Sequence, residues 1–291
     1  MISSNLIWIV LQKNFNPLKF LDTTIEFRYS YVEWYDTVAK VYHPCLPIKN
    51  VRFLPSSFVC SCCHRTSEGG SNMFFSQHEK IVFAGDSVTD HYSTNPIGEG
   101  PDGLGQGYVQ MVENSMSTWY PEMPIRIINA GISGNTSRDL LSRFQRDVIS
   151  LKPDWISICI GINDVWSQFR FRSMFEMHVY PDEYEKNLEQ MITATKENVK
   201  GIFIMTPYYI EPSSGDSMRA RMDEYANICR QLAKKHGCIL VDLQQAFDQQ
   251  LRFTHSSYLA LDGVHPSQVG CAVIARAFLD RCEFDYSHSP E

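Results

Sequence analysis

The residues that could form a nucleophile and its base lie far apart in the chain. Ser87 follows an apolar run in KIVFAGDSVTD, where Gly85 and Asp86 interrupt the run at a tight turn. His265 lies in LDGVHPS, three residues after Asp262, whose carboxyl can reach the second ring nitrogen of the histidine. A serine hydroxyl is a poor nucleophile at neutral pH and needs such a base. These residue types predict a catalytic triad of Ser87, His265 and Asp262 for acyl transfer.

The tetrahedral intermediate of acyl transfer carries a negative oxygen, which requires fixed hydrogen-bond donors. We expect these donors to be the backbone N–H groups of Ser87 and Gly131 and the side-chain amide of Asn163. Glycine at position 131 lets the backbone approach closely because it has no Cβ. Each segment also has a simple structural interpretation, since GIND resembles a β-turn, Gly131 can end a strand and DGVHPS can start a helix. Their occurrence after the second, third and fifth predicted strands favours catalysis.

Composition limits the possible partners. The chain has 291 residues, 44% of them hydrophobic, and a formal net charge of −7. This content is sufficient for a large core, and the charge argues against nucleic acid or an anionic membrane as a partner, because phosphate binding needs a basic surface. No apolar run reaches the roughly 20 residues of a membrane helix. A neutral small-molecule substrate fits this balance best.

Strands and helices are predicted to alternate after residue 80. Apolar runs predict five strands at 80–84, 125–130, 155–160, 201–205 and 238–241. Helical periodicity predicts a helix that starts at 108 and further helices at 136–151, 181–199, 217–236 and 267–279. The glycine-rich segment 98–107 is predicted to be a covering loop. This pattern predicts a three-layer α/β/α sandwich with a five-stranded parallel sheet, flavodoxin-like, whose reactive residues gather at the carboxyl ends of the strands.

Four segments resemble the four blocks of the SGNH (GDSL) hydrolase superfamily, in the same order: FAGDSVTD, NAGISGNT, IGINDVW and LDGVHPS. The resemblance extends from residue 80 to about residue 284. It implies that Ser87 is the nucleophile and that Asp262 and His265 complete a triad. It also implies that Gly131 and Asn163 are oxyanion donors together with the Ser87 amide, in an enzyme that needs no cofactor.

Other stretches resemble the bacterial acetylxylan (xylo-oligosaccharide) esterase branch: GINDVW, MHVYPDEYE and MTPYYIEP. This resemblance implies a serine esterase that removes a small acyl group, acetyl above all, from a sugar hydroxyl through an acyl-enzyme. Leu261 departs from the pattern, because an aromatic residue, usually Trp, is expected directly before the triad aspartate. An aliphatic side chain there could reshape the pocket. Two alternatives stay open, namely an esterase or lysophospholipase with a longer acyl preference and a non-catalytic carbohydrate-binding protein.

Further residues are candidates for the site. Asp164 is an alternative orienting acid, although the spacing to His265 favours Asp262. Asp86 is interpreted as a hydrogen-bonding turn residue beside the substrate and not as a catalytic carboxylate. Some aromatic side chains could stack on a sugar ring or pack in the core: Trp166, Tyr208 and Tyr209. We expect other histidines to be surface or packing residues, with a supporting role most plausible for the second: His91, His178, His236 and His255.

Residues 1–72 differ from the remaining chain. They contain isolated aromatics without a sustained period and end in the linker-like TSEGGSN, so we expect an extension of unknown role, poorly ordered or not part of the native enzyme, before a hydrolase domain at 73–291. The segment CSCCH lacks a second Cys or His pair at zinc-site spacing, and no metal is predicted. Scattered cysteines and the lack of a recognisable signal peptide predict a cytoplasmic protein. A homo-oligomer is compatible with the sequence.

Overall fold

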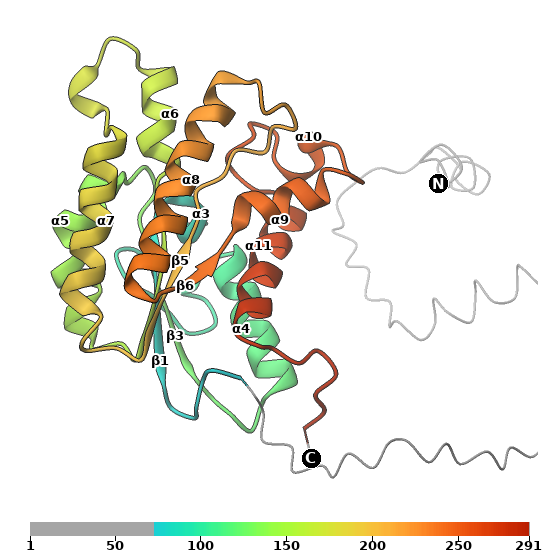
Figure 1. The fold of residues 1–291 in the computed structure, drawn as a ribbon. Coiled ribbons are helices and arrows are strands. Elements are labelled where there is room, and N and C mark those ends of the chain that lie inside the picture. Colours follow the sequence, from blue (N-terminus) through green and yellow to red (C-terminus); the bar gives the residue numbers. More distant parts are fainter. Residues whose placement is uncertain (1–72, 291) are drawn as a thin grey trace, which may run out of the picture. The chain divides into compact units, whose positions relative to one another are not determined.

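The computed structural model of this protein describes residues 73–290, in which a central sheet lies between two layers of helices (Figure 1). The strand order is β2-β3-β1-β4-β5-β6. The strands are β1 (Lys80–Gly85), β2 (Gly98–Glu99), β3 (Arg126–Gly131), β4 (Trp155–Cys159), β5 (Gly201–Met205) and β6 (Ile239–Val241). The expected extension 1–72, with its CSCCH segment, lies outside the described residues.

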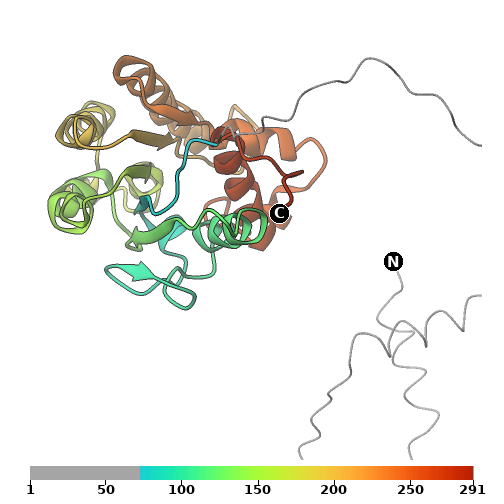
Figure 2. The same ribbon diagram turned by 90° about the horizontal axis from the view of Figure 1, so that it is seen from below.

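The main helices are α4 (Tyr108–Trp119), α5 (Ser137–Asp147), α7 (Pro181–Thr195), α8 (Ser217–His236), α9 (Leu243–Gln250) and α11 (Gln268–Arg281). Helices α5, α7 and α8 pack together on one face of the sheet, and α4, α9 and α11 pack on the other (Figure 2). The shorter elements are α3 (Ser87–Asp90), α6 (Ile162–Arg170) and α10 (Ser256–Leu259), with 3-10 turns at Ile149–Leu151 and Phe175–Met177. The α/β class and the three layers are confirmed.

Strand register brings the reactive turns together. The five strands other than β2 are parallel to one another, and most of their residues are buried, as expected for a sheet covered on both faces. Gly85 at the end of β1 lies opposite Gly131 of β3 on one side and Cys159 of β4 on the other. The segments that follow these three strands therefore start side by side at one edge of the sheet.

The prediction of five strands was wrong, because the sheet has a sixth strand. The two residues of β2 pair antiparallel with β3 inside the segment predicted as a loop. They contain no apolar run, and backbone pairing alone makes them a strand. The predicted helix 136–151 ends earlier as a helix, at Asp147, and 181–199 ends at Thr195. The segment interpreted as a turn at GIND instead begins α6.

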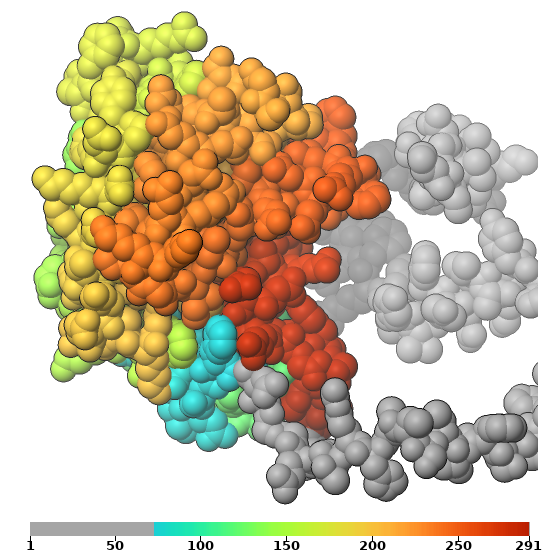
Figure 3. All heavy atoms as spheres, in the orientation of Figure 1, coloured from blue at the N-terminus to red at the C-terminus, as the bar shows by residue number. Residues whose placement is uncertain are grey.

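The start of the described region lies beside the end of α11, where cyan and red atoms adjoin in Figure 3. The backbone N–H of Phe74 approaches the carbonyl oxygen of Cys282 at 3.4 Å. Phe75 is buried and packs edge-on against Trp155, with ring centroids 5.3 Å apart. Within residues 73–290 no helix is both long and apolar enough to cross a bilayer.

Candidate active site

Ser87 occupies the first position of α3, directly after the sharp turn that ends β1. The turn needs glycine at position 85, because a Cβ there would lie 2.2 Å from Thr89 Oγ1 and 2.4 Å from the Cys159 carbonyl oxygen. Asp86 caps the helix, since its Oδ1 accepts the backbone N–H of Val88 at 3.0 Å. These contacts fix the Ser87 side chain at the end of the central strand.

The predicted triad residues are in hydrogen-bond contact. Ser87 Oγ lies 3.1 Å from His265 Nε2, and His265 Nδ1 lies 2.7 Å from Asp262 Oδ2. The other oxygen of Asp262 accepts the backbone N–H groups of Val264 at 3.0 Å and His265 at 2.8 Å. With Nδ1 protonated, Nε2 is free to accept the serine proton, which is the arrangement that a general base requires.

The loop that carries Asp262 and His265 is held at both ends. An antiparallel bridge joins Ala260 to Pro266, and Gly263 adopts a positive φ of 76° with Tyr209 packed against it. Partial burial acts to raise the pKa of Asp262, but the hydrogen bonds from His265 and Val264 and the charge of His265 outweigh it and keep that pKa below its ordinary value. Asp262 is therefore an anion at neutral pH and can stabilise a protonated His265.

A cavity of about 710 Å³ opens beside the triad. The residues that line it come from the ends of β1, β3 and β4 and from the last loop: Ser87, Asp90, His91, Tyr92, Ser93, Asn95, Ser133, Gly134, Asn163, Trp166 and His265. None of these eleven residues is aliphatic. The predicted nucleophile, base and amide donor thus face one cavity.

Asn163 is positioned by the start of α6. Gly161 before it has a φ of 129°, and a Cβ at that position would approach the Tyr184 hydroxyl to 2.8 Å. One hydrogen of the Asn163 amide is donated to the carbonyl oxygen of Asn135 at 3.0 Å. This bond fixes the side chain and leaves its second N–H for a ligand in the cavity.

Gly131 does not have the predicted role of oxyanion donor, because its backbone N–H already donates a hydrogen bond within the protein. That N–H donates to Asn129 Oδ1 at 2.9 Å, and the residue is buried outside the cavity lining. Gly134, three residues later, lines the cavity, and its N–H has no partner among residues 73–290. The sequence-based prediction missed Gly134 because NAGISGNT contains two glycines. The positive φ of 84° at Gly134 now identifies the exposed one.

The structure also contradicts two of the predicted substrate contacts. Asp86 is 1% exposed and does not line the cavity, and its Oδ2 is buried without a hydrogen-bond partner in the described region. Burial raises the pKa of Asp86 to about 7, against the opposing effects of the Val88 N–H and of His265. Tyr208 is fully buried, and its hydroxyl donates to the Val264 carbonyl oxygen at 3.0 Å. It therefore supports the loop that carries His265.

Trp166 is the predicted aromatic contact that does line the cavity. Its ring lies edge-on to His265, with centroids 5.5 Å apart. The guanidinium of Arg170 lies over the ring at 4.9 Å from its centroid. Trp166 therefore bounds the cavity next to the base and can contact a bound ligand.

The alternative orienting acid is engaged elsewhere. Both oxygens of Asp164 accept the backbone N–H of Ser137, at 2.9 and 3.1 Å, and Oδ1 also accepts the Ser137 hydroxyl. Burial raises the pKa of Asp164 to about 7, and these hydrogen bonds oppose the shift. Asp164 anchors α5, and the orienting contact to His265 comes from Asp262.

The four histidines expected to be surface or packing residues have different environments. His91 lines the cavity at the end of α3, which differs from the prediction, and burial lowers its pKa. His178 contacts the Phe171 carbonyl oxygen at 3.0 Å and does not line the cavity. His236 lies 2.8 Å from Glu189, and His255 caps α10. The packing or surface prediction therefore holds for the last three.

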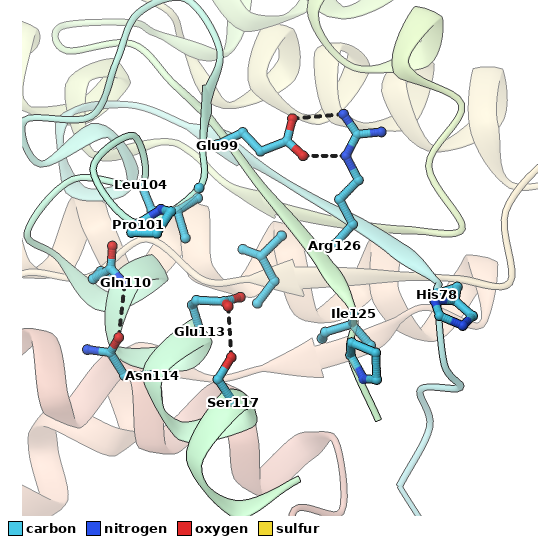
Figure 4. A pocket seen from close by; sticks show the side chains of 13 residues that line it. His78, Glu99, Pro101, Leu104, Gln110, Glu113, Asn114, Ser117, Ile125 and Arg126 are labelled. Atoms are coloured by element: carbon cyan, nitrogen blue, oxygen red, sulfur yellow. Dashed lines mark hydrogen bonds and ion pairs between the residues drawn. The ribbon is translucent and has the colours of Figure 1, made fainter. Parts of the chain in front are cut away.

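A second hollow of about 510 Å³ lies between the outer edge of β3 and α4 (Figure 4). Apart from His78, its polar side chains are joined in pairs: Glu99 binds Arg126 through both oxygens, Gln110 donates to Asn114 at 2.9 Å and Glu113 accepts from Ser117 at 2.9 Å. None of the predicted catalytic residues lines it. Ser87, Asn163 and His265 line the first cavity instead.

Comparisons with known proteins agree with this geometry. The profile of the GDSL-like Lipase/Acylhydrolase family matches residues 83–273. An acetylxylan esterase from Geobacillus stearothermophilus is 49% identical over 212 residues, which are 72% of this chain and 97% of that protein. A crystal structure of an acetylxylan esterase from the same organism gives a TM-score of 0.72 at 48% identity, covering 74% of this chain and 99% of that one. The crystal structure of an alpha/beta hydrolase enzyme from the metagenome of Lake Arreo, Spain, gives a TM-score of 0.71 at 46% identity, covering 73% of this chain and 98% of that one.

Solved mutants of the Geobacillus enzyme concern the same residue types. Its catalytic mutants replace a serine, an aspartate or a histidine by alanine, and the aspartate precedes the histidine by three positions. Another mutant replaces the tryptophan directly before that aspartate. Leu261 stands directly before Asp262 in this chain and is 93% exposed. The extent of the profile match and of the 49% identity show that the chain belongs to the GDSL-like lipase/acylhydrolase family, as a carboxylic ester hydrolase.

Proposed function

We propose that this chain removes acetyl groups from hydroxyls of small acetylated carbohydrates, with xylo-oligosaccharides as the substrate class. The observation that carries the proposal is the contact of Ser87 Oγ with His265 Nε2 at 3.1 Å at the wall of a cavity without aliphatic lining residues. The 49% identity to an acetylxylan esterase supports the acyl group and the sugar.

The reaction would proceed in two steps. The Ser87 oxygen attacks the ester carbonyl carbon while His265 takes the hydroxyl proton, and the sugar alcohol leaves with that proton. Asp262 holds the imidazole and stabilises its charged form. Water, deprotonated by His265, then attacks the acetyl-enzyme, so that acetate leaves and the Ser87 hydroxyl is restored.

Three donors would stabilise the oxyanion in both steps. They are the backbone N–H groups of Ser87 and Gly134 and the second amide N–H of Asn163. All three residues line the cavity that contains the nucleophile. Each donor of this kind is worth roughly 3–4 kcal/mol of transition-state stabilisation.

The lining of the cavity supports a small acyl group. A long acyl chain binds best along an apolar surface, which stabilises it by about 0.8 kcal/mol per buried CH₂. The cavity walls are formed by serine, asparagine, aspartate, histidine and glycine, and only Tyr92 and Trp166 present large hydrophobic rings. The lining therefore offers no aliphatic side chain to the long chain of a lysophospholipid, and its polar side chains can form hydrogen bonds with the hydroxyls of a sugar.

Acetate release from acetylated xylo-oligosaccharides tests the proposal. Wild type is expected to release acetate, and Ser87→Ala is expected to lose at least about 10³-fold in kcat. The matched control is Ser142→Ala, because Ser142 is an exposed serine of α5 outside the cavity. Fast aryl acetate hydrolysis without acetate release from the oligosaccharide would remove the sugar substrate and keep the reaction type. Equal aryl acetate rates for wild type and Ser87→Ala would overturn the mechanism.

We also propose a cytoplasmic location. The five cysteines of the described region are free, and four of them are buried in the core. Buried free thiols are typical of proteins that fold in a reducing compartment. Cell fractionation with an antibody against the native chain would test this, and recovery in the culture medium of intact cells would contradict it.

A further inference from the structure

Asp90 connects two walls of the catalytic cavity. It is the last residue of α3, three positions after Ser87, and its side chain is 5% exposed while still lining the cavity. Its carboxylate accepts five hydrogen bonds, which come from two separate loops. The two-step esterase mechanism gives this buried carboxylate no role.

One oxygen of Asp90 holds the loop after α3. Oδ1 accepts the Ser93 backbone N–H at 3.1 Å, the Ser93 hydroxyl at 2.9 Å and the Asn95 amide at 3.2 Å. The loop includes His91 and Tyr92, which have φ values of 38° and 67°, a conformation that is uncommon for residues other than glycine. All four loop residues named here line the cavity, so this oxygen fixes one wall.

The other oxygen holds the loop after β3. Oδ2 accepts the Ser133 backbone N–H at 3.2 Å and the Ser133 hydroxyl at 2.5 Å. Ser133 directly precedes Gly134, whose N–H is the donor assigned above to the oxyanion. Oδ2 therefore fixes the second wall of the cavity, which carries the proposed oxyanion donor.

We propose that Asp90 is a positioning residue whose two oxygens have different roles. Oδ2 places the Gly134 oxyanion donor through Ser133, and Oδ1 sets the width of the acyl pocket through Ser93 and Asn95. The inference rests on the proposed esterase mechanism. A carboxylate is needed because its two oxygens can accept all five donors, whereas an asparagine has one acceptor oxygen and would direct an NH₂ group at the N–H of Ser93 or Ser133. The backbone N–H groups of Ser93 and Ser133 can only donate a hydrogen bond. The hydroxyls of the same two serines could instead accept one from the asparagine NH₂ group.

Two variants that keep the carboxylate separate the two roles. Ser133→Ala is expected to lower kcat about tenfold for both aryl acetate and aryl butyrate, with little change in KM, because a misplaced oxyanion donor affects the transition state alone. Asn95→Ala is expected to change the acetate to butyrate ratio of kcat/KM about fivefold or more, with a smaller effect on kcat. Asp90→Asn is expected to combine both effects.

The control for a merely structural role is Asp242→Asn. Asp242 caps α9 and binds Arg230 outside the cavity, and its loss is expected to lower the Tm without changing the acyl ratio. Identical kinetic signatures for Ser133→Ala and Asn95→Ala would overturn the inference, as would an Asp90→Asn enzyme that loses only Tm. If Asp90→Asn does not fold, the first comparison still decides. Aryl esters test the inference without the sugar, and a fully active Ser87→Ala would instead reject the proposed mechanism.

Discussion

The side-chain oxygen of Asn129 accepts the backbone N–H of Gly131 at 2.9 Å. The amide of Asn129 in turn donates to the carbonyl oxygens of Thr89 at 2.7 Å and Leu104 at 2.8 Å. This buried side chain therefore joins β3 to α3 and to the loop before α4, and it consumes the N–H that was predicted to stabilise the oxyanion. The proposed oxyanion donor is instead the backbone N–H of Gly134, on the exposed side of the loop after β3.

Alanine at the two glycines is expected to have different consequences, mainly on stability at position 131 and mainly on activity at position 134. A Cβ at Gly131 would lie 2.3 Å from the Asp90 backbone nitrogen, so Gly131→Ala should chiefly destabilise the fold. A Cβ at Gly134 meets nothing within 4 Å, but the φ of 84° is strained for alanine. We expect Gly134→Ala to lose about 1 kcal/mol of stability and about 10- to 100-fold in kcat. Thermal unfolding and aryl acetate kinetics measure both, and full activity of Gly134→Ala would reject the reassignment.

Asp262→Asn tests the orienting contact. The amide cannot stabilise the protonated imidazole and favours the wrong tautomer, so kcat should fall about 10³- to 10⁴-fold with KM little changed. The matched variant is Asp164→Asn, which removes the alternative acid, bonded to Ser137 and not to His265. A loss that is equal in both variants, after correction for the folded fraction, would contradict the assignment of Asp262.

Asp86 should make stability depend on pH. Burial raises its folded-state pKa to about 7, against roughly 3.9 in an unfolded chain. Between these values the folded protein holds a proton that the unfolded chain has released, so the free energy of unfolding falls as the pH rises. Asp86→Asn removes this dependence, and its stability relative to wild type should increase by on the order of 1–4 kcal/mol from about pH 4.5 to pH 8.

Urea titrations at several pH values measure that difference. The control is Asp102→Asn, because Asp102 is an exposed loop residue away from the buried turn that contains Asp86. A constant difference for Asp86→Asn would show that the buried carboxyl does not titrate there. The capping bond to the Val88 N–H can be kept by asparagine, so it does not confound the comparison.

Trp166→Ala tests whether the aromatic wall binds the sugar. The ring lies next to His265 in the cavity, so its loss should raise KM for an acetylated xylo-oligosaccharide about tenfold and KM for aryl acetate less. Tyr208→Phe is the matched aromatic control. It should cost about 1 kcal/mol of stability through the lost bond to Val264, with both KM values unchanged. Equal KM changes for the two substrates would argue against a sugar contact at Trp166.

Much of this fold could be predicted from local patterns. The central strand and its turn at Ser87 are marked by an apolar run that ends at glycine, and the other parallel strands are similarly continuous. Reactive groups gather where parallel strands end, and this rule predicted that Ser87, Asn163 and His265 lie close together. These three residues do line one cavity.

The remaining features depend on tertiary contacts that a sequence does not display. Strand β2 exists through pairing with β3, and α6 starts where Gly161 has a φ of 129° that GIND does not reveal. The occupied N–H of Gly131 depends on a side chain two residues away, and the five bonds of Asp90 come from two loops. Tyr208 and Asp86 looked accessible because they follow strands, but both are buried.

The central claim is that the Ser87 oxygen becomes acetylated during turnover. Rapid acid quenching of wild type mixed with aryl acetate, followed by proteolysis and mass spectrometry, measures this directly. The account predicts the mass of one added acetyl group on the peptide that contains Ser87, absent from Ser87→Ala and accumulating in a variant whose deacylation is slowed. Turnover with the acetyl group on another residue, or with equal rates in Ser87→Ala, would contradict it.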